Sequence, residues 1–213
     1  MTRLVKLVNH GDYRAAITEA YSGRYGVEDF AGGSAPGAKD VISSRVVMGQ
    51  EYNVARAISS MHRDYARASI ARKAKPGSFV GRNYAAWLLW CYTEPESQSY
   101  ADALYLSAYE TLIDQIDRVE YDCMRGFAQV GQALKLLGGV MENHREHHRN
   151  GRTVHSLQKM AESLGLSSHA SVCGDKKWGR VRAGFERGVQ NLDCDAVNVL
   201  MQKLESYKQM AAA

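Results

Sequence analysis

The chain has 213 residues, with 45% hydrophobic and 23% charged side chains, a formal charge of +4 and a pI near 8.8. This is the composition of a folded globular protein that can bury a substantial core, and its mild basicity permits nucleic-acid binding without demanding it. No apolar run approaches the roughly 18 residues that span a bilayer, and the apolar run in the start MTRLVKLVNHG is too short for that of a signal peptide. The four cysteines form no CxxC pair, so we expect reduced thiols, a cytoplasmic protein and no membrane partner.

Charge is unevenly distributed along the chain. Residues 45–82 contain eight Lys/Arg and two acids, residues 94–122 contain eight acids and one arginine, and residues 125–187 contain eleven bases and five acids. Two basic regions on either side of an acidic one suggest separate surfaces for separate partners.

The first 45 residues are expected to hold one weak amphipathic helix and a flexible glycine-rich loop. Residues 4–21 place aliphatic side chains at helical spacing, with an interruption at Gly11. Residues 22–40 contain five glycines and Pro36, which is too much backbone freedom for a regular element. The lysine and Ser/Thr of a phosphate-binding loop are missing at their spacing, so that function is not expected.

A long helix is indicated over residues 46–74. Its apolar side chains recur at steps of four and three residues, at Val54, Ile58, Met61, Tyr65 and Ala68. The opposite face then carries Arg56, Arg63 and Arg67. Such a column either faces solvent or neutralises a nucleic-acid backbone, and in the second case we expect secondary, sequence-independent contacts.

The next two segments are predicted as core helices. The segment GRNYAAWLLWCYTEP, residues 81–95, crowds bulky groups onto nearly every side of a short helix, so that helix must be buried all round. Residues 100–124 place apolar side chains on one stripe and Glu110, Asp114 and Asp117 on the other face. A polar face is not the apolar setting of a catalytic carboxylate pair, and none is expected there.

Another helix is predicted from residue 127, ended by Gly138 and Gly139. The run MENHREHHRNGR that follows contains His144, His147 and His148. Glu146 stands two residues after His144, whereas the zinc protease motif has its glutamate directly after the first histidine. No cysteine lies near enough in the sequence to complete a structural zinc site. We therefore expect a polar, cationic linker, with no metal and no cofactor.

Residues 154–190 are predicted to form a helix-turn-helix. A first helix with helical apolar spacing ends at Gly165, where a positive φ is tolerated, and Ser167 or Ser168 could cap a second helix. A basic segment around Trp178 follows, and cations beside short polar side chains suit phosphate and base-edge contacts. The candidate DNA-binding residues are Ser168, His169, Lys176, Lys177, Arg180 and Arg182. The alternative is a helical hairpin with a solvated basic end.

Residues 191–195 are predicted to be a turn, with Asp193 or Asp195 as the cap of a final helix. No segment alternates with the period of a strand, so the expected fold is all-α. We expect a multi-helix bundle with a C-terminal helix-turn-helix-like segment and the glycine-rich loop near its start. The expected organisation is a weak helix and mobile arm in residues 1–45, a helical core in 46–140 and a DNA-binding region in 141–213.

Two segments of the sequence occur together in one known family. They are the tryptophan-rich AAWLLWCY, residues 85–92, and the C-terminal order Leu164-Gly165, Trp178, Phe185, Leu192-Asp193 and Ala196. In these segments, about a third of the chain, the sequence resembles the lambdoid-phage late-gene antitermination proteins, the zinc-free branch of the Q family. The chain has Val181-Arg182 where we would expect an Asn-Tyr pair.

The resemblance implies a transcription factor that acts through contacts and not through covalent chemistry. Such a protein binds double-stranded DNA near a phage late promoter in the host bacterial cell. It engages a paused RNA polymerase that holds its sigma factor, commonly with help from the elongation factor NusA, and then suppresses pausing and termination. Self-association on the DNA is a further expectation.

Two other classes of protein stay open. A DNA-binding transcriptional repressor would use the same helix-turn-helix, and a non-enzymatic helical interaction protein would show no salt-dependent DNA binding. An enzyme is not expected, because no nucleophile with a base, no metal set and no cofactor loop occurs at usable spacing.

Overall fold

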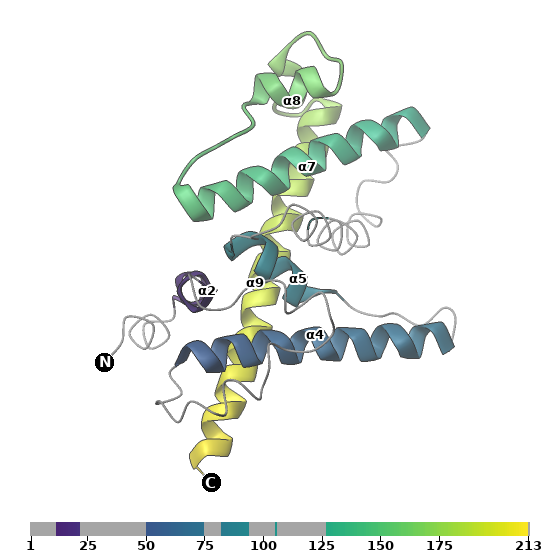
Figure 1. Ribbon diagram of the computed structural model, residues 1–213. Helices are drawn as coiled ribbons and strands as arrows, with labels where there is room; N and C mark the ends of the chain where they lie inside the picture. Colours follow the sequence, from purple (N-terminus) through teal and green to yellow (C-terminus); the bar gives the residue numbers. More distant parts are fainter. Residues whose placement is uncertain (1–11, 22–49, 75–81, 94–104, 106–126, 213) are drawn as a thin grey trace. The chain divides into compact units, whose positions relative to one another are not determined.

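The computed structural model describes residues 12–21, 50–74, 82–93, 105 and 127–212. Within these ranges the regular elements are all helices, and no strand occurs (Figure 1). The all-α prediction is therefore confirmed. The chain divides into two compact units, Met1–Ala108 with Cys194–Ala213, and Tyr109–Asp193. The three segments predicted from the sequence stay a prediction, and the glycine-rich loop and residues 106–124 lie outside the described residues.

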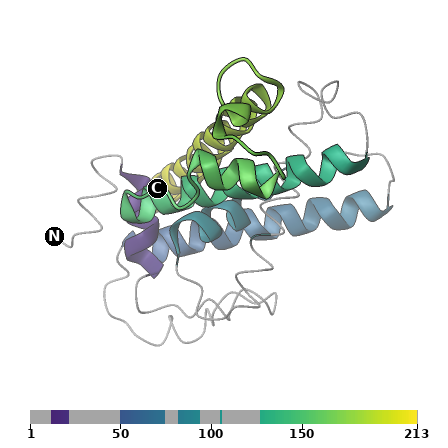
Figure 2. The same ribbon diagram turned by 90° about the horizontal axis from the view of Figure 1, so that it is seen from above.

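Among the described residues, the first unit contains three helices and the later part of a fourth. Helix α2 (Tyr13–Tyr21) packs against both α4 (Gln50–Ala74) and α5 (Tyr84–Tyr92) (Figure 2). Asp12 caps α2, since its Oδ1 accepts from the backbone N–H of Ala15 at 3.1 Å. Ala16, Ile17 and Ala20 of α2 are buried, so its inward face is the one that the spacing predicts.

Helix α5 is buried on all sides, as predicted. Every residue from Ala85 to Tyr92 is buried. Asn83 begins the helix by accepting the Ala86 N–H at 3.1 Å, and Thr93 closes it by donating to the Leu89 carbonyl at 2.6 Å. The Trp87 and Trp90 ring centroids lie 5.7 Å apart, an arrangement typical of attractive aromatic pairs.

Helix α4 has the predicted buried and charged faces. Val54, Ala57, Ile58 and Met61 are buried, whereas Arg56, Arg63 and Arg67 are exposed. Polar contacts tie α4 to the later part of α9 (Lys177–Ala212): Lys203 Nζ donates to Asp64 Oδ2 at 2.6 Å, and the Arg56 guanidinium lies 4.7 Å from the Tyr207 ring centroid. The column of guanidinium groups is thus an outer face of this unit.

In the second unit, helix α7 (Phe127–Asn150) continues through the two glycines that were predicted to end it. Gly139 instead lies under α8, where an added Cβ would be 3.6 Å from Met160 Cε. The buried side chains Val140 and Met141 continue the core face beyond this point. Tertiary packing therefore outweighs the low helix propensity of glycine, and the predicted linker is wrong because the histidine run is helical.

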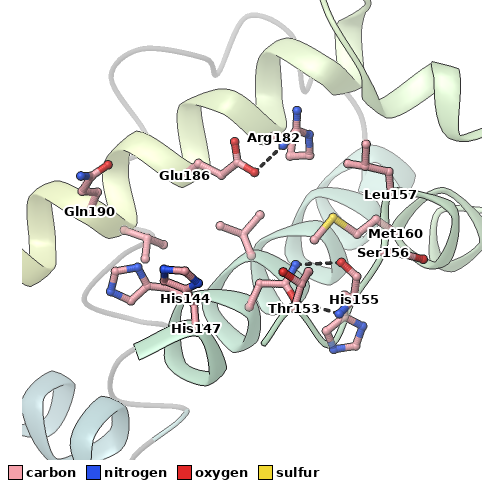
Figure 3. A pocket seen from close by; sticks show the side chains of 13 residues that line it. His144, His147, Thr153, His155, Ser156, Leu157, Met160, Arg182, Glu186 and Gln190 are labelled. Atoms are coloured by element: carbon pink, nitrogen blue, oxygen red, sulfur yellow. Dashed lines mark hydrogen bonds and ion pairs between the residues drawn. The ribbon is translucent and has the colours of Figure 1, made fainter. Parts of the chain in front are cut away.

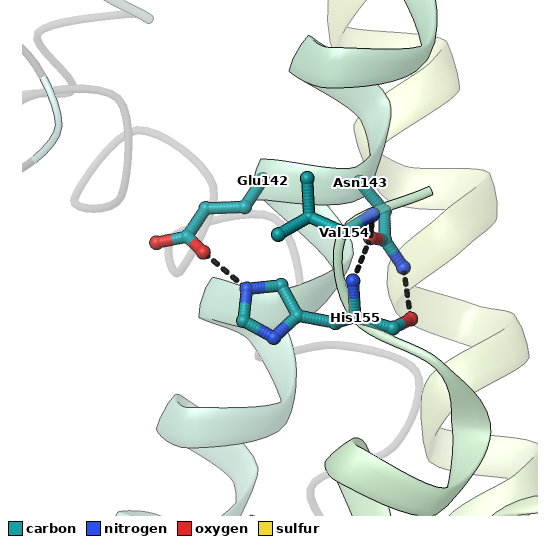
Figure 4. A network of polar contacts seen from close by, with 4 residues as sticks. All are labelled: Glu142, Asn143, Val154 and His155. Atoms are coloured by element: carbon teal, nitrogen blue, oxygen red, sulfur yellow. Dashed lines mark hydrogen bonds and ion pairs between the residues drawn. The ribbon is translucent and has the colours of Figure 1, made fainter. Parts of the chain in front are cut away.

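Helix α7 ends at Asn150, and Gly151 follows it with a φ of +65°. Asn143 then holds the following loop against the helix (Figure 4). Its Oδ1 accepts from the N–H groups of Val154 at 3.0 Å and His155 at 2.7 Å, and its Nδ2 donates to the His155 carbonyl at 2.8 Å. The His155 ring also contacts the Glu142 carboxylate. These bonds satisfy loop backbone groups that helix hydrogen bonds cannot reach.

Helix α8 (Leu157–Ser163) is capped by Ser156. Gly165 follows the helix at φ +73°, the positive φ that the sequence predicts there. The second helix of the predicted helix-turn-helix is only a 3-10 turn, η3 (His169–Val172), with Ser168 as its cap. The next α-helix is α9, a 36-residue helix that begins at Lys177. None of the helices in the described ranges is both long and apolar enough to cross a membrane.

The predicted turn at residues 191–195 is wrong, since α9 runs straight through it. Leu192 and Asp193 are buried while Asn191 and Cys194 are exposed, which is the pattern of a helix with one face inward. The buried stripe continues at steps of three and four through Val181, Phe185, Val189, Leu192, Ala196, Leu200 and Leu204. This unbroken stripe stabilises one long helix over the local turn preference of Asn and Asp.

Candidate nucleic-acid interface

The six residues predicted to bind DNA lie on three consecutive parts of the second unit. Ser168 caps the 3-10 turn η3 and His169 begins it. Lys176 immediately precedes α9, and Lys177, Arg180 and Arg182 lie in the first turns of that helix. Ser168, His169, Lys176 and Arg180 are exposed. The fold therefore leaves four of the six side chains where a large ligand could reach them.

The start of α9 carries the positive charge of this segment. The Lys177 ammonium lies 5.6 Å from the Trp178 ring centroid, a cation–π contact that holds the lysine over the aromatic face. Among the described residues, neither Lys176 nor Arg180 has an ion-pair partner. Because the N-terminal end of an α-helix also has a positive dipole, exposed cations at this end favour the approach of an anion.

Two glycines fix the loop before α9 onto the helix. Gly174 has a φ of +59°, and a Cβ on Gly179 would lie 2.4 Å from the Gly174 carbonyl oxygen and 2.5 Å from that of Cys173. No real Cβ tolerates such distances, so residue 179 must be glycine for the loop to lie where it does. The close approach keeps Lys176 beside the first turn of α9.

Arg182 has a different environment from the other five residues. Its Nε donates to the Val172 carbonyl at 2.9 Å, and its guanidinium pairs with the Glu186 carboxylate one turn further along α9. The side chain is only 20% exposed. Arg182 therefore links η3 to α9 within the protein. The spacing of lysines and arginines suggested that Arg182 contacts DNA. It did not reveal the bond to Val172, because the acceptor is a backbone carbonyl ten residues earlier.

The predicted secondary contacts lie in the first unit. Arg63 and Arg67 project from α4 with no ion pair in the described part of the chain, while Arg56 is held by the ring of Tyr207. An exposed column of this kind can neutralise phosphates without reading bases.

A cavity of about 550 Å³ in the second unit was not predicted from the sequence (Figure 3). Its lining includes the apolar side chains Val140, Leu157, Met160 and Val189. The polar part of the lining comes from α7, the loop after it and α9: Asn143, His144, His147, Thr153, His155, Ser156, Arg182, Glu186 and Gln190. The histidine run was the one sequence feature that could have pointed to this cavity. Because the run was expected to be a linker, its position in a helix that lines the cavity was not anticipated.

Comparisons with protein-family models, with curated protein sequences and with solved structures find no match for this chain.

Proposed function

We propose that this protein is a non-enzymatic DNA-binding factor that contacts double-stranded DNA with η3 and the first turns of α9. The observation that carries the proposal is the exposure of Lys176 and Arg180 at the N-terminal end of a long helix. Ser168 and His169 stand beside them on the preceding turn and supply the short polar groups that usually accompany base contacts.

The geometry supports a recognition element that differs from the expected helix-turn-helix. A 3-10 turn is too short to lie along a major groove as a recognition helix, so the start of α9 takes that role in the proposal. Ser168 keeps the turn in place by accepting the Ala170 N–H at 3.2 Å, and Arg182 ties it to α9. A rigid, cationic edge is what a base-reading contact requires.

The resemblance to the Q antitermination proteins leads us to propose a specific role for this DNA contact. In this role the protein binds near a phage late promoter, joins the paused RNA polymerase with its sigma factor, and lets that polymerase pass terminators with help from NusA. Arg63 and Arg67 serve as secondary backbone contacts. Self-association on the DNA belongs to the same proposal.

The deciding experiment is run-off transcription with a terminator downstream of a late promoter from the genome that encodes the chain. Added protein should increase read-through past the terminator without increasing initiation. Loss of transcript before the terminator would instead identify a repressor. If the protein changes neither quantity and binds a 30-base-pair duplex with no salt dependence, the DNA-binding proposal is refuted and a structural helical protein is favoured.

A further inference from the structure

The histidine run of α7 forms a cluster of imidazole rings on the helix. The ring centroids of His144 and His148 lie 4.5 Å apart, and those of His147 and His148 lie 5.7 Å apart. The expectation of no metal rested on the position of Glu146, which does not fit the zinc protease motif, and on the lack of a nearby cysteine in the sequence. In a helix the same residues lie close together, because side chains four positions apart are neighbours on one face.

A pair of histidines at this spacing can hold one metal ion from a single helix. The two imidazoles of the zinc protease helix motif stand at the same i and i+4 positions. Neutral imidazole nitrogen is a good ligand for zinc, copper and nickel, with a metal–nitrogen distance of about 2.0–2.1 Å for zinc. Small rotations of two rings that are already in contact would bring one nitrogen of each within that reach.

A buried carboxylate stands behind one of these rings. Asp193 Oδ1 lies 3.8 Å from His144 Nε2, and the Asp193 side chain is only 1% exposed. A carboxylate beside the second nitrogen of a ligating histidine orients the ring and raises its basicity. A buried negative charge also favours a cation nearby. Two neighbouring arginines would repel a metal ion, but carboxylates partly neutralise their charges. The Arg149 guanidinium lies 4.0 Å from Glu146 Oε1, and Arg182 pairs with Glu186.

The cluster can be reached from solvent. His148 is exposed, and His144 lines the 550 Å³ cavity between α7 and α9 (Figure 3). An ion bound by two imidazoles could therefore keep water at its other coordination positions. Access of this kind is one of the requirements of a credible metal site.

We propose that His144 and His148 form a bidentate site for a divalent transition metal of the zinc, copper and nickel class, with Asp193 as the residue that orients His144. The metal would join two successive turns near the end of α7. It would thereby stabilise the part of α7 to which Asn143 fastens the following loop. The proposal does not depend on DNA binding and can be tested without DNA.

The test uses the full chain, purified without a polyhistidine tag and treated with chelator, in isothermal titration with zinc chloride and separately with nickel chloride. We expect one metal per chain, and a higher melting temperature in the presence of the metal. His148→Ala should weaken binding at least tenfold, because only one of the two proposed ligands, His144, remains. Asp193→Asn should weaken binding by about tenfold, in line with other outer-sphere carboxylates.

Two variants serve as matched controls, with far-ultraviolet circular dichroism as the check on folding. His155→Gln removes a histidine that lines the same cavity but contacts Glu142, and it should bind metal like the wild type. His147→Ala should do the same. Copper(II) bound to the wild type should show two nitrogen ligands in its electron paramagnetic resonance spectrum. The proposal is overturned if a folded His148→Ala variant binds as tightly as the wild type, or if His147→Ala abolishes binding instead.

Discussion

Arg182 donates from Nε to the carbonyl oxygen of Val172 at 2.9 Å, across a separation of ten residues. The bond joins the end of the 3-10 turn to the second turn of α9, and the same guanidinium also pairs with the Glu186 carboxylate. The positions of Ser168 and His169 relative to α9 therefore depend on a side chain that sequence reasoning assigned to DNA.

Arg182→Ala should lower the free energy of unfolding by about 1–3 kcal/mol, because a charged hydrogen bond to a partly buried carbonyl is lost. Arg180→Ala, which removes an exposed side chain two residues earlier, should change it by less than about 0.5 kcal/mol. Urea denaturation followed by circular dichroism measures both. Equal stability of the two variants would mean that the Val172 link contributes nothing to folding.

Trp90→Ala should be among the most destabilising single changes in the first unit. The residue is 1% exposed, and the ring centroids of Trp87 and Tyr105 lie 5.7 and 5.6 Å from that of Trp90. Its removal leaves a large cavity and should cost roughly 3–5 kcal/mol, measured by thermal or chemical denaturation. If the variant melts like the wild type but loses activity in transcription, α5 acts as a partner-binding surface and not as core.

Gly179→Ala should destabilise the second unit even though alanine is the better helix former. The new Cβ would meet the Gly174 carbonyl oxygen at 2.4 Å, and relieving the clash should cost about 1–3 kcal/mol. Gly131→Ala is the matched control, since that helical position is exposed and has no neighbouring heavy atom within 4 Å. The control should gain about 0.5–1 kcal/mol. We expect the melting temperature to fall for Gly179→Ala and to rise for Gly131→Ala.

Arg180→Ala and Arg63→Ala should affect DNA binding differently. If the Arg180 guanidinium reads a base, its loss should reduce binding to the cognate duplex by about 1–3 kcal/mol and leave binding to random duplexes nearly unchanged. Arg63→Ala should weaken both duplexes alike and make the salt dependence shallower by about one unit. Fluorescence anisotropy at several salt concentrations measures these quantities.

Lys135→Ala, an exposed change on α7, controls for the loss of one positive charge. The assignment of the two surfaces is reversed if Arg180→Ala binds the cognate duplex like the wild type while Arg63→Ala loses discrimination.

The sequence alone predicted the elements whose signal is local and dense. The block around Trp87 and Trp90 is apolar on every side, so burial was its only stable outcome. The spacing of Val54, Ile58 and Met61 similarly required a helix with an arginine face, and Gly165 marked a helix end because few other residues adopt a positive φ. These features depend on side chains within a few turns of one another.

Tertiary structure decided the places where local preference and packing disagree. Gly138 and Gly139 do not end α7, because α8 packs on Gly139 and the core face continues beyond it. Residues 191–195 form no turn, because the buried stripe of α9 passes through Leu192. In both cases the free energy gained by burying a continuous apolar face exceeds the small free-energy cost of placing single unfavourable residues in a helix.

The candidate sites divide in the same way. Exposure of Lys176 and Arg180 followed from the polarity of their segment and could be anticipated from the sequence. The partner of Arg182 and the proximity of Asp193 to His144 could not, since each involves an atom supplied by a distant part of the chain. Residue types and spacing determine which groups are available, and only packing of one helix against another determines which of them meet.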